Sequence, residues 1–339
     1  MVTIKDIARE LGVSPSTVTR ALAGNTRISA ETIRRVREQA EQMGYVADSA
    51  ARAMRSGTSA LIGLLVPDIQ NSFYATMARI AAQCCQRAGY QLVLSVTEDD
   101  PEIEERHVRA LIGARCAGVM VVPTGGVTPA TCQLLSGVPT VQLIRRAEGL
   151  RADSFGVNDR QALFAATGYL LDLGHRRIAL LVGDKTLDTA RARFNGYVDA
   201  FAARGLQPDI DLVCAGAPRA SQGSEALRAL LSRRVPPTAI VAAGAALTEG
   251  MLDAVSAHYG STYPDVSLLG FGDTAAFRWW QGEGLSTIAL PITTIAEAAG
   301  ARLLALIKTP RAAAPPVESV SFDTSMVLRG SARPPVERS

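Results

Sequence analysis

The sequence has little of what enzymes and metalloproteins usually need. Its 339 residues include three histidines and five cysteines, and neither type occurs in Cys-x-x-Cys or His-x-x-x-His spacing. It also contains no Gly-x-Ser-x-Gly turn and no Walker-type phosphate-binding loop. Because those patterns mark metal centres, activated nucleophiles and nucleotide sites, we expect no metal, no cofactor and no enzymatic activity.

Long apolar runs and a recognisable export signal are also missing. A membrane helix needs about 20 consecutive apolar residues, and an export signal places basic residues before an apolar segment. An odd number of cysteines without motif spacing is typical of free thiols in a reducing compartment. We therefore expect a cytoplasmic protein with no membrane partner.

Basic charge is concentrated in the first part of the chain. Residues 1–58 hold nine basic and six acidic side chains, whereas the remaining residues hold 26 of each. The whole formal charge of +3 therefore falls on the amino-terminal segment. A polyanion such as DNA would dock where positive charge gathers.

The same segment predicts three short helices. Thr3, Ser14 and Ser29 are good helix N-caps, and apolar residues recur after each of them at the spacing of one helix face. Gly12 and Gly44 end the first and third helices. Three helices with a very short first connection form a helix-turn-helix, whose second helix lies in the major groove of DNA.

From residue 60 onward, apolar strands alternate with helices. Strands are expected at 60–66, 90–95, 118–122, 140–143, 178–182, 239–242, 266–269 and 317–322. Near-continuous apolar strands separated by helices are typical of parallel sheets covered on both faces. The alternation restarts near residue 160, which predicts two doubly wound lobes with a ligand cleft beyond the carboxyl ends of their strands.

Several motifs give the chain a resemblance to a known family. They are TIKDIA at 3–8, GVSPSTVTRAL at 12–22, ARAMR at 51–55, IGLLVPDI at 62–69, LGHRRIA at 173–179 and RARFNGY at 191–197. Their order and spacing resemble the lactose/galactose repressor family of bacterial transcription factors. The resemblance implies a three-helix headpiece, a body like periplasmic sugar-binding proteins, dimerisation, and operator binding that depends on an effector.

The expected domains follow this division. They are a helix-turn-helix head at 1–46, a hinge linker at 47–59, an effector-binding and dimerisation body at 60–330 and a tail at 331–339. Within the body, the first lobe is expected near 60–160 and 292–321, and the second near 161–291 and 322–330. The tail carries prolines and no heptad repeat, so we expect a dimer on a pseudo-palindromic operator rather than a coiled-coil tetramer.

The resemblance assigns residues of the second helix to DNA reading. Pro15, Ser16 and Arg20 match base-reading positions, and Arg20 can donate two hydrogen bonds to a guanine edge. Small hydroxyls near helix starts suit phosphate contacts, so the expected contacts in the head also include Thr3, Ser14, Thr17 and Thr19. The resemblance implies two more phosphate contacts, Asn25 and Ser29. Helix capping is the alternative explanation for the hydroxyls, and an ordinary solvated arginine is the alternative for Arg20.

The linker supplies a second expected DNA contact. In the family it folds as a short helix in the minor groove when DNA pairs two copies, and an apolar side chain wedges between base steps. The matching contacts here are Ala51, Arg52 and Met54, with Met54 where leucine is more usual. Packing of Met54 against the partner linker is the alternative.

The resemblance also supplies candidates for effector binding, which are Phe73, Tyr74, Arg145, Asp159, Arg193, Gly244 and Asp273. Ordinary core packing is the alternative for the two aromatic residues, and a surface charge is the alternative for Arg193. The roles of Trp279 and Trp280 stay open between stacking and core packing.

Two departures from the family pattern bear on the effector. Gly244 and Ala245 stand where a polar pair is usual, and Gly272 replaces the first of two aspartates that commonly bind sugar hydroxyls. With Arg145 and Arg193 close to these positions in the family, the losses favour an anionic effector such as a sugar acid or phosphosugar.

Three other classes of protein share parts of this pattern. An enzyme lacks a catalytic constellation here, and an exported binding protein would need an export signal and no head. A nucleoid protein without a ligand is the third, favoured by the altered positions 244–245 and 272. A ligand-responsive repressor accounts for both the head and the body, and a transcriptional activator is the alternative role.

Overall fold

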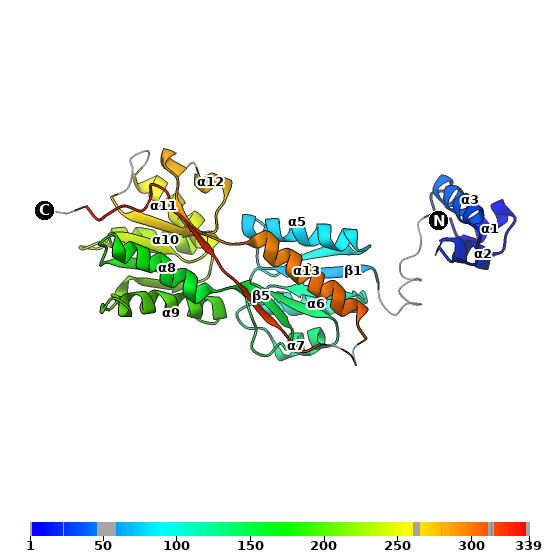
Figure 1. The fold of residues 1–339 in the computed structure, drawn as a ribbon, viewed down its shortest axis with the longest axis horizontal. Helices are drawn as coiled ribbons and strands as arrows, with labels where there is room; N and C mark the ends of the chain where they lie inside the picture. The colour runs from blue at the N-terminus through cyan, green and yellow to red at the C-terminus, as the bar shows by residue number, and fades with distance from the viewer. Residues whose placement is uncertain are drawn as a thin grey trace. The chain divides into compact units, whose positions relative to one another are not determined.

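The computed structural model describes residues 2–22, 24–45, 59–259, 265–278, 280–310, 313 and 315–336. The chain divides into two compact units, Met1–Ser59 and Ala60–Ser339, both drawn in Figure 1. The expected linker contacts Ala51, Arg52 and Met54 lie outside the described residues, as does Trp279. Among the described helices, none combines the length and apolarity that crossing a membrane would take.

The described residues of the first unit form three helices, α1 (Ile4–Leu11), α2 (Pro15–Leu22) and α3 (Ala30–Gln42). Asp6 accepts hydrogen bonds from the backbone N–H and the hydroxyl of Thr3, which fixes the start of α1. Gly12 ends α1 in the left-handed conformation at φ 64°, a conformation that favours glycine. The three helices bury one apolar core made of Ile7, Ala8, Val18, Ala21, Val36 and Ala40.

The first lobe of the second unit is built on a parallel sheet in the order β11-β5-β4-β3-β1-β2. Its strands are β1 (Leu61–Val66), β2 (Gln91–Val96), β3 (Gly118–Val121), β4 (Thr140–Leu143), β5 (Asp153–Val157) and β11 (Ser319–Phe322). Its helices are α5 (Ser72–Arg87), α6 (Pro101–Gly113), α7 (Pro129–Ser136) and α13 (Ile292–Lys308). Alternate residues of β1 face opposite sides: Ile62 and Leu64 pack against α5 and α13, whereas Leu65 packs against α6 and α7.

The second lobe repeats this plan with the order β12-β10-β9-β8-β6-β7. Its strands are β6 (Ile178–Gly183), β7 (Val213–Gly216), β8 (Ala239–Ala242), β9 (Ser267–Phe271), β10 (Ser286–Ala289) and β12 (Ser325–Val327), of which only β12 runs antiparallel. Its helices are α8 (Asp159–Asp172), α9 (Asp188–Ala202), α10 (Ala220–Leu231), α11 (Ala245–Tyr259) and the short α12 (Ala275–Arg278). Short 3₁₀ turns lie at Ile210–Leu212 and Trp280–Gly282.

The chain passes between the two lobes more than once (Figure 1). It leaves the first sheet after β5 to form α8, returns after β10 to form α13, and leaves again from β11 to β12. Each lobe is therefore assembled from segments that are distant in the sequence. This connectivity places the carboxyl ends of the parallel strands of both lobes along the cleft described below.

Paired helices in the second lobe meet through glycines. A Cβ added at Gly196 on α9 would overlap the carbonyl oxygen of Arg160 on α8, and one added at Gly250 on α11 would overlap that of Ala220 on α10. Backbone therefore packs directly on backbone at both crossings.

We predict that Gly250→Ala lowers the free energy of unfolding by about 2–3 kcal/mol, because α10 and α11 must separate to admit the methyl group. Gly113→Ala is the matched control, since nothing lies within 4 Å of a Cβ added at that helical glycine. The control is expected to gain about 0.5 kcal/mol from reduced chain entropy. Urea unfolding followed by circular dichroism measures both, and equal stability of the two variants would refute the close-packing account.

Candidate nucleic-acid interface and ligand cleft

The exposed side of α2 carries the side chains expected to read DNA. Pro15, Ser16 and Arg20 are exposed, while Val18 on the opposite side of the helix is fully buried. The guanidinium of Arg20 has no hydrogen-bond or ion-pair partner among the described residues, whereas its backbone carbonyl accepts from the Asn25 N–H. A guanidinium that nothing in its own unit holds is available to an external acceptor.

Hydroxyls at the start of α2 form a small network. The Ser14 hydroxyl lies 2.8 Å from that of Ser16 and 2.9 Å from that of Thr17, and it accepts a hydrogen bond from the Thr17 N–H. The Thr19 hydroxyl donates to the Pro15 carbonyl at 3.0 Å. Ser14 therefore caps the helix, as expected, and its exposed neighbours present hydroxyls around the helix start.

The remaining expected contacts of the head also have local partners. Thr3 bonds to Asp6, the Asn25 side-chain oxygen accepts from the Arg27 N–H, and the Ser29 hydroxyl accepts from the Thr32 N–H. All three are exposed. Helix capping thus explains Thr3 and Ser29, a local turn explains Asn25, and the role of all three toward DNA stays a prediction.

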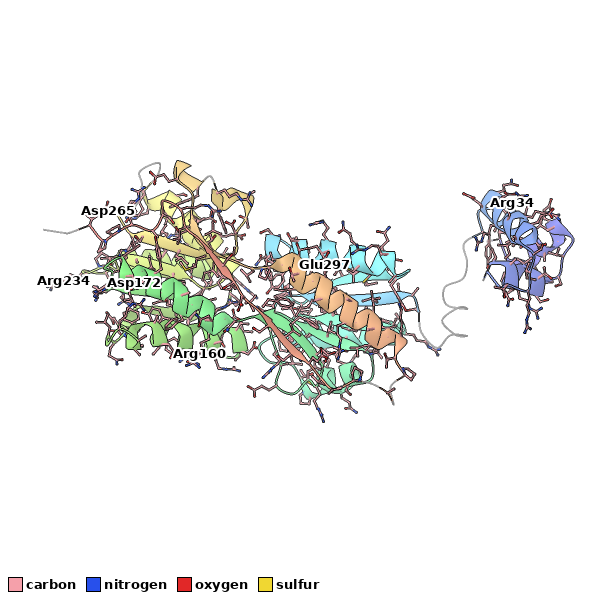
Figure 2. The ribbon with its side chains drawn as sticks, in the orientation of Figure 1. Arg34, Arg160, Asp172, Arg234, Asp265 and Glu297 are labelled. Carbon is pink, nitrogen blue, oxygen red and sulfur yellow. The ribbon has the colours of Figure 1, made fainter. Side chains whose placement is uncertain are left out.

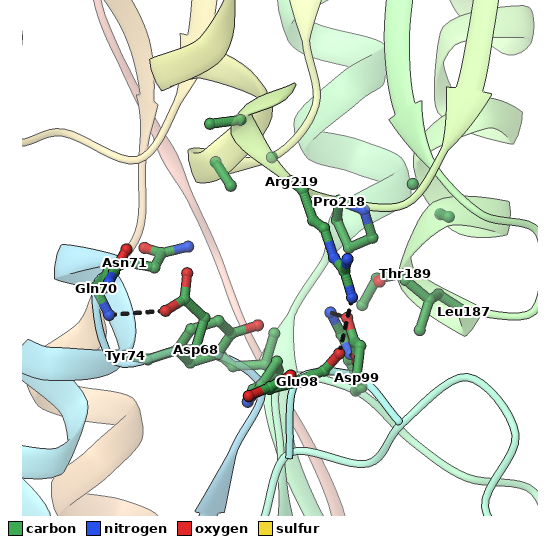
Figure 3. A pocket seen from close by; sticks show the side chains of 18 of the residues that line it. Asp68, Gln70, Asn71, Tyr74, Glu98, Asp99, Leu187, Thr189, Pro218 and Arg219 are labelled. Carbon is green, nitrogen blue, oxygen red and sulfur yellow. Dashed lines mark hydrogen bonds and ion pairs between the residues drawn. The ribbon is translucent and has the colours of Figure 1, made fainter. Parts of the chain in front are cut away.

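A cleft of about 550 Å³ lies between the two lobes of the body, seen from close by in Figure 3. Residues that follow strands line it from both sides: Asp68 after β1, Asp99 after β2 and Arg145 after β4 in the first lobe, and Arg219 after β7 and Gly244 after β8 in the second. This is the edge where doubly wound sheets bind ligands.

The arginine of the first lobe is held by an aspartate of the same lobe. Arg145 is buried and makes a bidentate ion pair with Asp99, with one Nη2–Oδ2 distance of 3.0 Å. It also donates to the Pro123 carbonyl at 3.3 Å. Both ends of the guanidinium are occupied, and its charge is neutralised inside the lobe.

The arginine of the second lobe is held in the same way. Arg193 on α9 donates from Nε to Asp159 at 2.6 Å and from Nη1 to the Ala243 carbonyl at 2.9 Å. Its guanidinium carbon lies 4.0 Å from the centre of the Phe271 ring, in cation–π contact. Arg193 is therefore fixed at the cleft wall by three neighbours.

These two pairs revise the expected effector chemistry. The preference for an anionic ligand assumed that Arg145 and Arg193 were free to bind it, but each already has a carboxylate partner, half-buried for Arg145 and buried for Arg193. An incoming anion would have to displace those carboxylates or be repelled by them. The arrangement therefore gives no support for a sugar acid or phosphosugar.

The structure brings four of the seven expected effector residues to the cleft: Tyr74, Arg145, Arg193 and Gly244. Asp159 does not line the cleft itself but accepts a hydrogen bond from Arg193, which does. Phe73 is buried in the core and packs edge-on against Tyr74 with ring centres 5.1 Å apart. Phe73 is not a lining residue, so its role is core packing.

Asp273 is the clearest departure from expectation. It makes a bidentate ion pair with Arg329, at 2.7 and 3.1 Å, and accepts from the Thr287 hydroxyl at 3.1 Å. It is absent from the cleft lining. Asp273 ties β9 to the segment after β12, which corrects its assignment as a ligand contact.

Several lining residues were not expected from the sequence. They are Asp68, Gln70 and Asn71 after β1, Glu98 and Asp99 after β2, Thr189 on α9, Arg219 before α10 and Glu249 on α11. Arg219 crosses the cleft and donates to the Glu98 carbonyl at 3.2 Å (Figure 3). For Asp68, Gln70 and Asn71 the available signal was their position after the buried strand β1, which marks the ligand edge of such sheets.

Family models match both parts of the chain. Residues 3–48 match the model of bacterial regulatory proteins of the lacI family, and residues 167–332 match a periplasmic binding protein-like domain. The HTH-type transcriptional regulator GalR of Salmonella typhimurium is 30% identical over 339 residues, which cover 99% of this chain and 98% of that protein. The chain belongs to the LacI family.

Other relatives agree with this placement in the LacI family. The HTH-type transcriptional repressor PurR of Pasteurella multocida is 27% identical, with 91% of each chain covered. The crystal structure of the Lac repressor dimer bound to operator and the anti-inducer ONPF has a TM-score of 0.81 at 22% identity and covers 98% of this chain and 99% of that one. The LacI-family fold expected from the sequence is confirmed, and the protein is a DNA-binding transcriptional regulator that responds to a small molecule.

A buried carboxyl group lies beneath the cleft of this regulator. Glu104 on α6 has no exposed surface; its Oε2 accepts from the Thr124 N–H at 2.9 Å, and its Oε1 has no partner among the described residues. Burial is the main cause that raises the pKa of Glu104 to about 7. The neutral form is therefore favoured in the folded protein.

We predict a pH-dependent stability that Glu104→Gln removes. Because the folded-state pKa of about 7 exceeds the usual value of 4.5, the stabilising effect is complete below pH 4.5 and is lost as pH rises through 7. The difference amounts to about 3 kcal/mol. Urea unfolding at pH 5 and pH 8 compares the proteins, and parallel pH profiles for wild type and variant would contradict the assignment.

Proposed function

We propose that the protein is a cytoplasmic repressor that binds a pseudo-palindromic operator as a dimer, with its affinity controlled by a metabolite in the interlobe cleft. The observation that carries the proposal is the combination of two features on one chain. The head presents an unpartnered Arg20 on the exposed side of α2, and the body encloses a polar cleft of about 550 Å³ between two lobes. No catalytic role is proposed for either part.

DNA reading is assigned to the exposed side of α2. Pro15, Ser16 and Arg20 would contact base edges, because a major groove admits one helix and displays a distinct pattern for each base pair. The exposed hydroxyls of the head would contact phosphates. Ala51, Arg52 and Met54 of the linker are proposed minor-groove contacts on the strength of the family resemblance.

Control by the cleft requires that its occupancy change how the lobes meet. The lobes are joined by three chain crossings, and the ligand edge of each sheet faces the other lobe. A ligand that prefers one arrangement of the lobes shifts the population toward it. The linker would transmit that shift to the head. Fixing the backbone of one residue costs about 1–2 kcal/mol, so a modest rearrangement of the lobes would be enough to change whether the linker folds on DNA.

We predict that Arg20→Ala weakens binding to the cognate operator by about 1–3 kcal/mol per half-site, because a bidentate contact to guanine is lost. Arg34→Ala is the matched control, since Arg34 on α3 (Figure 2) is an exposed arginine paired only with Glu38. Fluorescence anisotropy on the selected operator and on a scrambled duplex compares both variants. Equal losses on the two duplexes would reduce Arg20 to a phosphate contact.

The dimer is tested by the mass of the protein in solution. A single chain has a mass of 35.8 kDa, and the tail carries no heptad repeat that could join dimers into tetramers. We predict that sedimentation equilibrium at micromolar concentration gives twice the chain mass. A tetramer at that concentration, or a monomer that still binds the palindrome with full affinity, would contradict the proposal.

A further inference from the structure

Two carboxylates from opposite lobes face the same cleft. Asp68 lies in the turn after β1 of the first lobe, and Glu249 lies on α11 of the second, and both are lining residues. Figure 3 shows the Asp68 carboxylate pointing into the open space, with Gln70 and Asn71 beside it. The two acids are 181 positions apart in the sequence, so only the fold brings them to one cavity.

Neither carboxylate has a cation to neutralise it. The hydrogen bond to Asp68 comes from the backbone N–H of Gln70 at 2.8 Å, and neither acid forms an ion pair within the described part of the chain. Burial raises the pKa of Glu249, and the neighbouring charges that add to this effect are the carboxylates of Asp68 and Asp253. The two lining acids therefore repel each other across the cleft.

Two of the three arginines that line the cleft are already neutralised by other acids. Arg145 and Arg193 are bound to Asp99 and Asp159 within their own lobes. Arg219 donates to the carbonyl of Glu98, whose own carboxylate adds a further negative charge to the lining. Arg219 keeps its own positive charge, so it balances Glu249 in the net charge of the second-lobe wall. The first-lobe wall holds Asp68, Glu98 and Asp99 against Arg145 and carries the excess of negative charge.

We propose that the effector is a small organic cation whose protonated amine is bound between Asp68 and Glu249. This inference rests on the proposed function, because it names the class of ligand for the same cleft. Ammonium groups donate up to three hydrogen bonds and form strong charge-assisted bonds to carboxylates. The amide groups of Gln70 and Asn71 and the hydroxyl of Thr189 would bind polar groups on the rest of the ligand.

The same arrangement explains how such a ligand would act. Without a cation, bringing the lobes together moves two like charges toward each other in a partly desolvated space, which opposes closure. An amine between them replaces repulsion by two attractions, one to each lobe. Binding and closure of the cleft would therefore be coupled through these two side chains.

Three four-carbon probes with a polar group at each end test the sign of the charge. Putrescine carries an amine at each end, butane-1,4-diol carries hydroxyls and succinate carries carboxylates. Thermal unfolding of the full chain without DNA, at fixed ionic strength, measures stabilisation by each probe. We expect putrescine at 10 mM to raise the unfolding temperature of the body by at least about 2 °C, and the other two to leave it unchanged.

Variants assign the effect to the two acids. Asp68→Asn and Glu249→Gln should each weaken putrescine binding about tenfold or more in calorimetric titration, because a charge-assisted bond is lost. Glu297→Gln is the matched control, since Glu297 (Figure 2) is an exposed acid on α13 away from the cleft lining. Its affinity for putrescine should equal that of the wild type.

Each other outcome overturns the inference. An unfolding temperature that putrescine leaves unchanged, stabilisation by succinate, or equal putrescine affinity in wild type and in Asp68→Asn and Glu249→Gln would exclude an amine bound by these acids. Operator binding by the same preparation without any probe is measured separately. Loss of DNA binding there would count against the proposed function and leave the charge preference of the cleft untouched.

Discussion

Two arginine–aspartate pairs, one in each lobe, remove two cations from the lining of the cleft. Arg145 with Asp99 and Arg193 with Asp159 satisfy the guanidinium groups inside their own lobes. A buried arginine without its partner would cost several kcal/mol, so these pairs hold the cleft walls in place. With both arginines neutralised, the charge of the site is set by Asp68, Glu98 and Glu249 against the single cation Arg219.

The polar contacts between the two lobes are more exposed than the ion pairs of Arg145 and Arg193. Arg219 donates to the Glu98 carbonyl, the Arg146 N–H donates to Asp188 at 3.0 Å, and Arg191 pairs with Glu148 at 3.2 Å. Exposed ion pairs contribute about 1 kcal/mol or less. Rigid lobes joined by weak polar contacts suit a body whose lobes respond to a ligand.

The sequence was sufficient to predict the three helices of the head and the alternation of strands and helices in the body. Caps such as Thr3 and Ser29 are local signals, and buried strands such as β1 and β8 are continuous apolar runs. It missed the strands β5, β7, β10 and β12, which are short or interrupted by polar residues and glycine, so periodicity alone does not separate them from loops.

The site was harder to predict because its decisive contacts are not local. Asp99 and Arg145 are 46 positions apart, and Asp273 and Arg329 are 56 apart. Family positions therefore identified Arg193 and Tyr74 as lining residues but not the partner of either arginine. Asp68 and Glu249 were not predicted, because nothing in the local sequence shows that a turn after β1 and the helix α11 share a cavity.

The central claim is that the arrangement of the two lobes sets the affinity of the head for DNA, and it can be tested without any ligand. A Cβ added at Gly125 in the first lobe lies 3.2 Å from that of Thr186 in the second, close to the separation that a disulfide spans. Gly125→Cys with Thr186→Cys, in a Cys132→Ser background, locks the lobes on oxidation. We predict that operator affinity differs at least fivefold between oxidised and reduced protein, whereas identical affinities would contradict the account.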